Sequence, residues 1–164
     1  MATPTNLPAS FAIGSVLTAS QQNDLRGAFR VLQVKTMETA TLVSNASSTY
    51  VGSGLTLSIT PQASSSKILI MTNSSIAKTG ANTSNGVNLQ MRRGSTVLTS
   101  QTALLFTGTG IVNIGAATMM YLDSPSTTSA TTYDVQFANF VNAAAVEHNG
   151  NGSASSIVLM EISA

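Results

Sequence analysis

The residues of this sequence that could do acid–base or metal chemistry are few and scattered. The only histidine, His148, lies in the segment VEHNGNG, where the asparagines and glycines that follow it are typical of a turn. A general base is the functional alternative, but the sequence has no cysteine and no second histidine to complete a zinc site, which takes three or four such ligands. The sequence therefore predicts no zinc centre, and we favour a structural role for His148.

The carboxylates form no metal-binding pattern. They are Asp24, Glu38, Asp123, Asp134, Glu147 and Glu161, and none belongs to a D-x-D or E-x-x-H cluster. Asp123 and Asp134 flank the run SPSTTSATTY, and across a hairpin they would approach each other and suggest a cation site. The alternative that we favour places Asp123 at the start of a turn and Asp134 on the solvent face of a strand.

Serine is abundant, but no G-x-S-x-G segment that would expose a nucleophile occurs. The glycine-containing stretches GTGIVNIG and GNGS lie in β context, without a following helix whose N-terminus could hold phosphate. The sequence therefore shows no nucleophile elbow, no phosphate-binding loop and no metal-binding pattern.

Charge is unusually scarce. Charged residues make up 8% of the 164 residues and the formal net charge is +1, against about 25% charged residues in an average soluble domain. Binding of nucleic acid through phosphate neutralisation needs clustered Lys and Arg, so that class of protein is excluded. No apolar run reaches the roughly 20 residues of a membrane helix, and the first residues do not resemble a secretion signal. We expect assembly in a cytoplasm, and low net charge favours association between copies.

Strand-like segments fill the chain from residue 31 onward. In the stretch 55–60, Leu55, Leu57 and Ile59 alternate with hydroxylated residues, as in a half-buried strand. The predicted strands cover 31–37, 55–60, 67–77, two strands within 86–98 that turn near Gly94 and Ser95, 111–122, 131–140 and 155–162. The more continuous apolar start of 67–77 predicts a central strand covered on both faces. Short strands separated by Gly, Ser, Asn and Pro predict an all-β fold, an antiparallel β-sandwich or jelly roll over residues 31–164.

Residues 1–30 differ from the rest and predict an extended N-terminal arm. Pro4 and Pro8 keep the first segment extended, and SVLTASQQNDLRGAFR carries the one short helix that the sequence predicts. A helix this short needs a partner surface to be stable. We predict that the apolar residues of the arm anchor the chain to a partner, and these are Leu7, Phe11, Ile13, Val16, Leu17, Leu25 and Phe29. The alternative is an arm folded back on its own domain.

Two further groups of side chains bear on contacts between chains. Arg92 and Arg93 are adjacent in a strand, so they point to opposite faces and cannot clamp one ligand together. We predict that Arg92, Arg93, Asp123 and Asp134 are possible inter-subunit contacts, with solvated side chains beside a turn as the alternative. The methionines of the predicted strands, Met71, Met91, Met119, Met120 and Met160, are expected to fill gaps in the core.

Four separated blocks of the sequence carry a family resemblance, and they are LTLSITPQASSSKILIM at 55–71, LQMRRGSTVL at 89–98, YLDSPSTTSATTYDVQF at 121–137 and SIVLMEISA at 156–164. In this order they resemble a β-sandwich module of tailed-bacteriophage virion proteins, such as the tail-fibre-like and structural proteins of cyanophages. The segment FAIGSVLTASQQNDLRGAF is also similar to a G-x-V-L-T-A-x-x-x-N segment near the start of phage tail and head accessory proteins. The resemblance covers about residues 31–164.

This resemblance implies a homotrimer on the surface of a virion, without enzymatic activity or cofactor. The chain has no heptad or collagen-like shaft repeat, which favours a capsid cement or decoration protein that binds the major capsid protein. The alternatives are a short tail fibre or tail appendage that binds the host surface and, in other classes, a lectin-like sugar-binding module or a glycan hydrolase. Aromatic residues are scattered through the predicted strands, which leaves a sugar-stacking platform unsupported.

The serine- and threonine-rich stretch between Leu122 and Tyr133 is predicted to be a hairpin connection. Pro125 stops the preceding strand, and Asp123 can cap the turn. Its hydroxyl groups can satisfy backbone groups without charge, so we interpret it as a candidate loop for contact between subunits.

Overall fold

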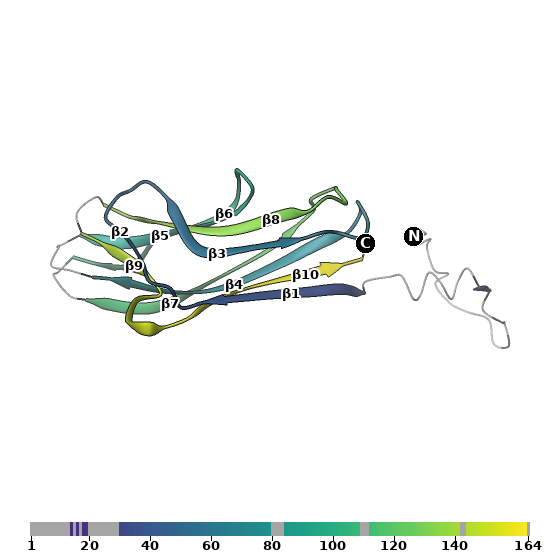
Figure 1. Ribbon diagram of the computed structural model, residues 1–164, viewed down its shortest axis with the longest axis horizontal. Coiled ribbons are helices and arrows are strands. Elements are labelled where there is room, and N and C mark those ends of the chain that lie inside the picture. Colours follow the sequence, from purple (N-terminus) through teal and green to yellow (C-terminus); the bar gives the residue numbers. More distant parts are fainter. Residues whose placement is uncertain are drawn as a thin grey trace.

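The structure, a computed structural model, describes residues 30–79, 84–108, 112–141 and 144–163, together with the isolated residues 14, 16, 18 and 19. Within these ranges the chain forms ten strands and one short 3-10 helix (Figure 1). These are β1 Val31–Thr39, β2 Val43–Asn45, β3 Val51–Ile59, β4 Lys67–Lys78, β5 Asn85–Arg93, β6 Thr96–Thr107, β7 Asn113–Asp123, β8 Thr131–Asn139, β9 Val146–His148, η1 Gly150–Gly152 and β10 Ser155–Ile162. Their pairings are antiparallel, which confirms the predicted all-β class.

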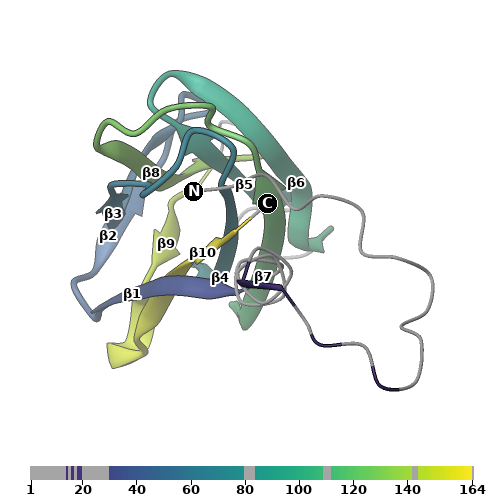
Figure 2. The same cartoon turned by 90° about the vertical axis from the view of Figure 1, so that its right-hand side faces the viewer.

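The strands form two sheets that face each other (Figure 2). In the first, called sheet A, β7 pairs with β4 from Ile68 to Lys78. The other edge of β4 pairs with two strands, with β10 along its first part and with β9 along its last part. On their far sides, β10 pairs with β1 and β9 pairs with β2. Sheet A therefore has four columns, β1/β2, β10/β9, β4 and β7. Sheet B has the order β3-β8-β5-β6.

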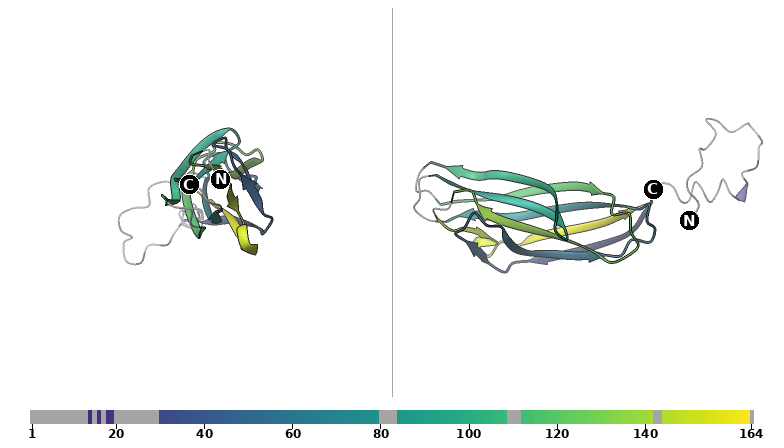
Figure 3. Two further views of the ribbon diagram at one scale, coloured as in Figure 1. Left: turned by 90° about the vertical axis from the view of Figure 1, so that its left-hand side faces the viewer. Right: turned by 90° about the horizontal axis from the view of Figure 1, so that it is seen from above.

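The order of the strands is that of a jelly roll. If β1/β2 and β9/β10 each count as one column, sheet A contains the first, eighth, third and sixth strands of the chain, and sheet B the second, seventh, fourth and fifth. Such interleaving of two antiparallel sheets is the double Greek key of the jelly roll. The strands follow the long axis of the molecule (Figure 3). The predicted β-sandwich or jelly roll is thus confirmed, with the jelly-roll order.

The core lies between the sheets and follows the predicted alternation. Leu55 and Ile59 of β3 are buried, as that alternation requires. The fully buried apolar side chains include Ile68, Ile70, Val87, Leu89, Met91, Val135, Phe137, Ile157 and Leu159. Strand β4 is central, as predicted, but both of its faces are covered only from Ser74 onward. Between Lys67 and Asn73 the outward side chains remain partly exposed, so the predicted double coverage is wrong for that half.

Two connections that the sequence predicts as hairpins differ in outcome. Gly94 and Ser95 join β5 to β6 in a hairpin, and the positive φ of +55° at Gly94 suits glycine, which has no Cβ to clash there. The connection 124–130 is not a hairpin, because β7 belongs to sheet A and β8 to sheet B. It crosses from one sheet to the other at the end of the sandwich.

Changing Gly86 to alanine is expected to destabilise the fold by about 1–3 kcal/mol, because overpacking forces backbone shifts. A Cβ atom at Gly86 would lie 2.9 Å from the carbonyl oxygen of Leu104 in the neighbouring strand, and backbone cannot move aside as a flexible side chain can. Gly52→Ala in β3 is the matched control, because a Cβ there meets nothing within 4 Å. Urea denaturation of both variants measures the difference, and equal midpoints would contradict the prediction.

Candidate assembly surface

The predicted arm anchors fall largely outside the described residues. This holds for Leu7, Phe11, Ile13, Leu17, Leu25 and Phe29 and for the predicted helix. Val16 is described, and its side chain is 90% exposed. The described chain begins at Arg30, whose backbone N–H donates a hydrogen bond to Ser163 Oγ at 2.8 Å beside the C-terminal end of β10. Arg30 thus lies at one end of sheet A.

The four charged residues predicted as possible inter-subunit contacts form two ion pairs within the chain. Arg92 lies opposite Asp134 on neighbouring strands β5 and β8, with Nη2 at 3.0 Å from Oδ2. Both side chains are partly exposed, and the alternation of buried residues along β8 places the pair on the outward face of sheet B. Asp134 therefore faces outward, as favoured from the sequence, and a contact of this pair with another subunit stays a prediction.

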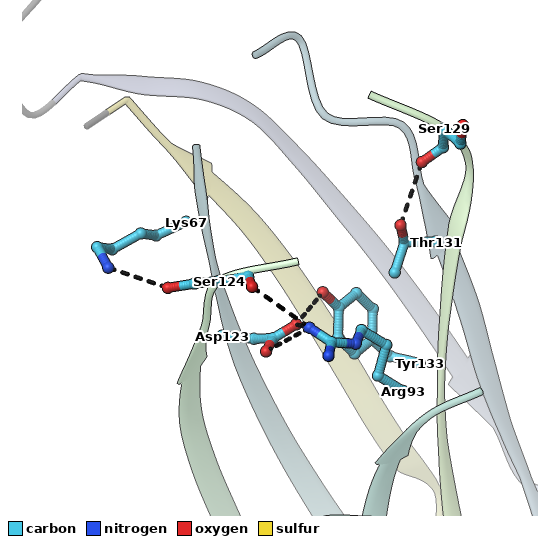
Figure 4. A network of polar contacts seen from close by, with 7 residues as sticks. All are labelled: Lys67, Arg93, Asp123, Ser124, Ser129, Thr131 and Tyr133. Carbon is cyan, nitrogen blue, oxygen red and sulfur yellow. Dashed lines mark hydrogen bonds and ion pairs between the residues drawn. The ribbon is translucent and has the colours of Figure 1, made fainter. Parts of the chain in front are cut away.

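The second pair, between Arg93 and Asp123, links the two sheets (Figure 4). Arg93 Nη1 donates to both carboxylate oxygens of Asp123 at 2.8 Å, and the Tyr133 hydroxyl donates to Oδ2 at 2.7 Å. Asp123 is 5% exposed and Tyr133 is fully buried. Asp123 therefore does not serve as the turn cap that the sequence suggested, because its oxygens are already bound by partners on β5 and β8 of sheet B. The two arginines do point to opposite faces, as predicted.

Tyr133 is held in its protonated form. Its burial, together with the hydrogen bond to the Asp123 carboxylate and the negative charge of that carboxylate, raises the pKa of Tyr133 far above its usual value of 10.0, although the Arg93 charge opposes the shift. The hydroxyl therefore remains a donor to Asp123 at physiological pH. The network is a structural clamp between the sheets. The cation site, which was the less favoured interpretation of Asp123 and Asp134, does not form, because each carboxylate binds its own arginine.

The hydroxylated connection 124–130 carries local hydrogen bonds of the predicted kind. The Ser129 backbone N–H donates to Thr127 Oγ1, and Thr131 Oγ1 donates to the Ser129 carbonyl oxygen. Lys67 Nζ donates to Ser124 Oγ at 3.0 Å, which ties the connection to the start of β4 (Figure 4). Hydroxyl groups thus satisfy the backbone without charge, while contact with another subunit stays a prediction.

The outward side of sheet A carries an apolar surface that sequence reasoning missed. The strand register aligns two rows of side chains across β1, β10, β4 and β7. We call these eight residues the sheet A face. One row is Val34, Met160, Leu69 and Leu122, and the next is Thr36, Val158, Met71 and Met120. Seven of the eight are apolar and none is charged, although all eight are partly or largely exposed.

The exposure of this face is largest along the edge strand β7. Met120 is 69% exposed and Leu122 is 51% exposed, and Val34 on β1 at the opposite edge is 51% exposed. Met71, Met120 and Val158 line an open groove of about 360 Å³ together with Thr118, Ser156 and Asn73. The expectation that the methionines fill the core is correct for Met91 and Met119 but wrong for Met71, Met120 and Met160, which lie on the sheet A face. Contiguous apolar surface of this kind marks sites of interaction with another molecule.

His148 has the surroundings of a core residue. It lies on β9 opposite Ile76, is fully buried, and its ring centroid is 5.7 Å from that of Phe137. Within the described part of the chain neither ring nitrogen has a hydrogen-bond partner. Burial disfavours the charged ring and lowers the pKa of His148 from 6.5 to about 4. The structure therefore places a neutral imidazole in the core rather than in a turn.

The described ranges contain no group of three or more histidine and carboxylate side chains that could hold a metal ion. Among the same residues, no helix combines the length and the apolar character that crossing a membrane requires.

No protein-family model and no curated protein matches the sequence. Among solved structures, the chain is similar to a chain of T=1 particles derived from infectious bursal virus, with 11% identity and a TM-score of 0.40 over 82% of this chain and 37% of the other. It is also similar to a chain of the VP2 subviral particle of infectious bursal disease virus, with 14% identity and a TM-score of 0.37 over 82% and 38%. The chain thus spans less than two fifths of the length of these neighbours, and similarity at this level assigns neither family nor function.

Proposed function

We propose that this chain is a structural protein of a virion, a homotrimeric capsid cement or decoration protein that binds the major capsid protein and stabilises the shell without enzymatic activity. The observation that carries the proposal is the sheet A face, an uncharged apolar surface on a rigid jelly roll. Exposing a surface of this kind to water costs free energy, and burial within an assembly, against a further copy of the chain or another subunit, removes that cost.

The choice between a virion protein and a sugar-binding protein depends on the sheet A face and not on the fold. Jelly rolls occur in viral capsid proteins and in lectins, so the fold alone does not select a function. A lectin site needs polar side chains to hydrogen-bond sugar hydroxyls beside an aromatic ring, whereas the sheet A face offers methionine, leucine and valine side chains. The face therefore favours assembly over sugar binding.

The proposed mechanism adds attachment through the N-terminal arm. In a trimer, the first arm to bind brings the other two to their sites, so their binding is intramolecular and the avidity rises. Burying roughly 600 Å² of apolar surface per arm would contribute a gross term of about 15 kcal/mol at 25 cal/mol per Å². The ordering of the arm opposes much of that term.

Deletion of residues 1–29 tests the attachment. The deletion leaves Arg30 and its hydrogen bond to Ser163 Oγ in place. We expect the shortened protein to keep its β-sheet circular dichroism and thermal midpoint but to lose binding to capsids, measured by co-sedimentation with particles. Full decoration by the shortened protein would contradict the anchoring role, and particles that resist heat equally well without the protein would contradict the cement role.

One observation favours the alternative of a tail appendage that binds the host surface. Phe106 and Phe140 are 48% and 41% exposed and pack edge to face, with ring centroids 5.7 Å apart. They lie near the ends of β6 and β8, at the end of the sandwich away from the C-terminus (Figure 1). Electron microscopy of virions with a labelled chain separates the functions, because label on the tail together with adsorption of purified protein to host cells would replace the cement proposal.

A further inference from the structure

We propose that the sheet A face is the seam through which copies of this chain associate with one another. The inference goes beyond the proposed function, since self-association through this face requires no virion and sets no number of copies. The occupant of the face is thus a second copy of the chain, rather than the capsid, a small ligand or the chain's own N-terminal segment.

The dimensions of the face suit a protein partner. Four columns about 4.8 Å apart and two rows about 6.6 Å apart give a surface of about 19 Å by about 13 Å. This corresponds to roughly 250 Å² on each copy, or roughly 500 Å² for two copies, before side-chain relief is counted. Specific protein interfaces begin at about 1,200 Å² of total buried surface and combine an apolar centre with a polar rim. The sheet A face is therefore large enough to form the apolar centre of a self-association interface, whose rim would lie on the neighbouring rows.

The charge pattern favours a second copy over a different partner. Near a symmetry axis a residue meets the same residue of the other copy, so a charged side chain there would be repelled by its own equivalent. The two rows of the sheet A face carry no charge over the full width of the sheet. The charged residues next to the rows, Lys67 and Glu38, lie beyond them at opposite ends of the face. A charged partner surface would find no counter-charge within the rows.

The side chains of the centre are also suited to packing against their equivalents. Met71, Met120 and Met160 are unbranched and flexible, so they adapt to a facing copy without strain. The open groove between Met71, Met120 and Val158 gives a protruding side chain of the facing copy a place to insert. Packing of two such faces would bury the side chains that the single chain leaves exposed.

Met120→Lys in the full-length chain tests the seam by sedimentation equilibrium and by light scattering after size exclusion. We expect the unchanged protein to be oligomeric at micromolar concentration and Met120→Lys to weaken its association at least tenfold, because the lysine of each copy would face that of the next. Val97→Lys is the matched control, since Val97 is 50% exposed on β6 of sheet B. Circular dichroism and thermal melting show that both variants are folded.

A second readout uses the absence of cysteine from the sequence. A spin label on Met120→Cys should show dipolar coupling between copies, and a label on Val97→Cys should show weaker coupling. Three results would each overturn the seam. The unchanged protein could be monomeric, or the Met120→Lys variant could associate as strongly as the unchanged protein. The third is that deletion of residues 1–29 dissociates the oligomer whereas Met120→Lys does not. A monomeric Met120→Lys protein that still decorates capsids supports the seam and contradicts only the proposed gain in avidity from linked arms.

Discussion

Replacing Asp123 with alanine is expected to lower the free energy of unfolding by about 2–3 kcal/mol, because removing the carboxylate leaves a buried donor without an acceptor. Asp123 is 5% exposed and accepts hydrogen bonds from Arg93 and from the buried hydroxyl of Tyr133. Without the carboxylate, the Tyr133 hydroxyl loses its acceptor and the Arg93 guanidinium loses its counter-charge. Both losses fall at the only ion pair within the described residues that joins sheet A to sheet B. Urea denaturation with two-state fitting measures the effect.

Asp134→Ala is the matched control for that experiment. The pair between Arg92 and Asp134 has similar chemistry, but it lies on one sheet, and both of its side chains keep access to water. We expect a cost of about 1 kcal/mol or less, as is usual for exposed pairs. Tyr133→Phe, which removes only one donor from the network, should fall between the two variants. Equal costs for Asp123→Ala and Asp134→Ala would show that burial and the link between sheets contribute nothing.

The strands could be predicted from the sequence where one local pattern determines them. The segment 155–162 alternates between core and outward positions, and β10 has those bounds. The hairpin at Gly94 follows from turn chemistry that two adjacent residues supply. Strands β2 and β9 were not predicted, because three residues each are too few to show a period, and their pairing depends on neighbours far along the chain. His148, on β9, was therefore assigned to a turn.

Contacts between the sheets could not be predicted by the same reasoning. Arg93 and Asp123 are 30 positions apart and meet only because β5 and β7 lie in opposite sheets. The predicted hairpin at 124–130 was wrong for a related reason, since local turn residues do not reveal whether the next strand joins the same sheet or the other. The burial of Lys78 could not be predicted either. Its ammonium group donates to the Thr107 carbonyl oxygen, a contact between residues far apart in the sequence.

The sheet A face had a signal in the sequence, although it was read as core. In the segment TMMYL of β7, Met119 and Tyr121 point inward, and Met120 and Leu122 point outward. Apolar residues at both parities of a strand predict burial on both faces. In this chain the second face is exposed, so the same pattern indicates a surface that another molecule would cover.

Lowering the pH from about 6.5 to about 4 is expected to reduce the free energy of unfolding by up to about 3 kcal/mol through His148. Burial lowers the pKa of His148 from 6.5 to about 4. Above pH 6.5 the ring is neutral in both states and adds no pH dependence. Between these values the unfolded chain binds a proton that the folded chain excludes, so stability falls as the pH falls. Below about pH 4 the folded ring is protonated as well, and the loss levels off.

His148→Leu should remove this dependence, because leucine has similar volume and no group that titrates. Glu161 provides the internal comparison. Burial by itself would raise the pKa of Glu161, but hydrogen bonds from Gln33 Nε2 and the Gln62 backbone N–H, with others, lower it below 4.5. Its stabilisation is therefore lost only as the pH falls below about 4.5. Urea midpoints measured from pH 7 to pH 3 should thus be flat for His148→Leu down to about pH 4.5 and should fall only below it. An undiminished slope between pH 6.5 and pH 5 in that variant would mean that another group, and not the unpartnered core imidazole, takes up the proton.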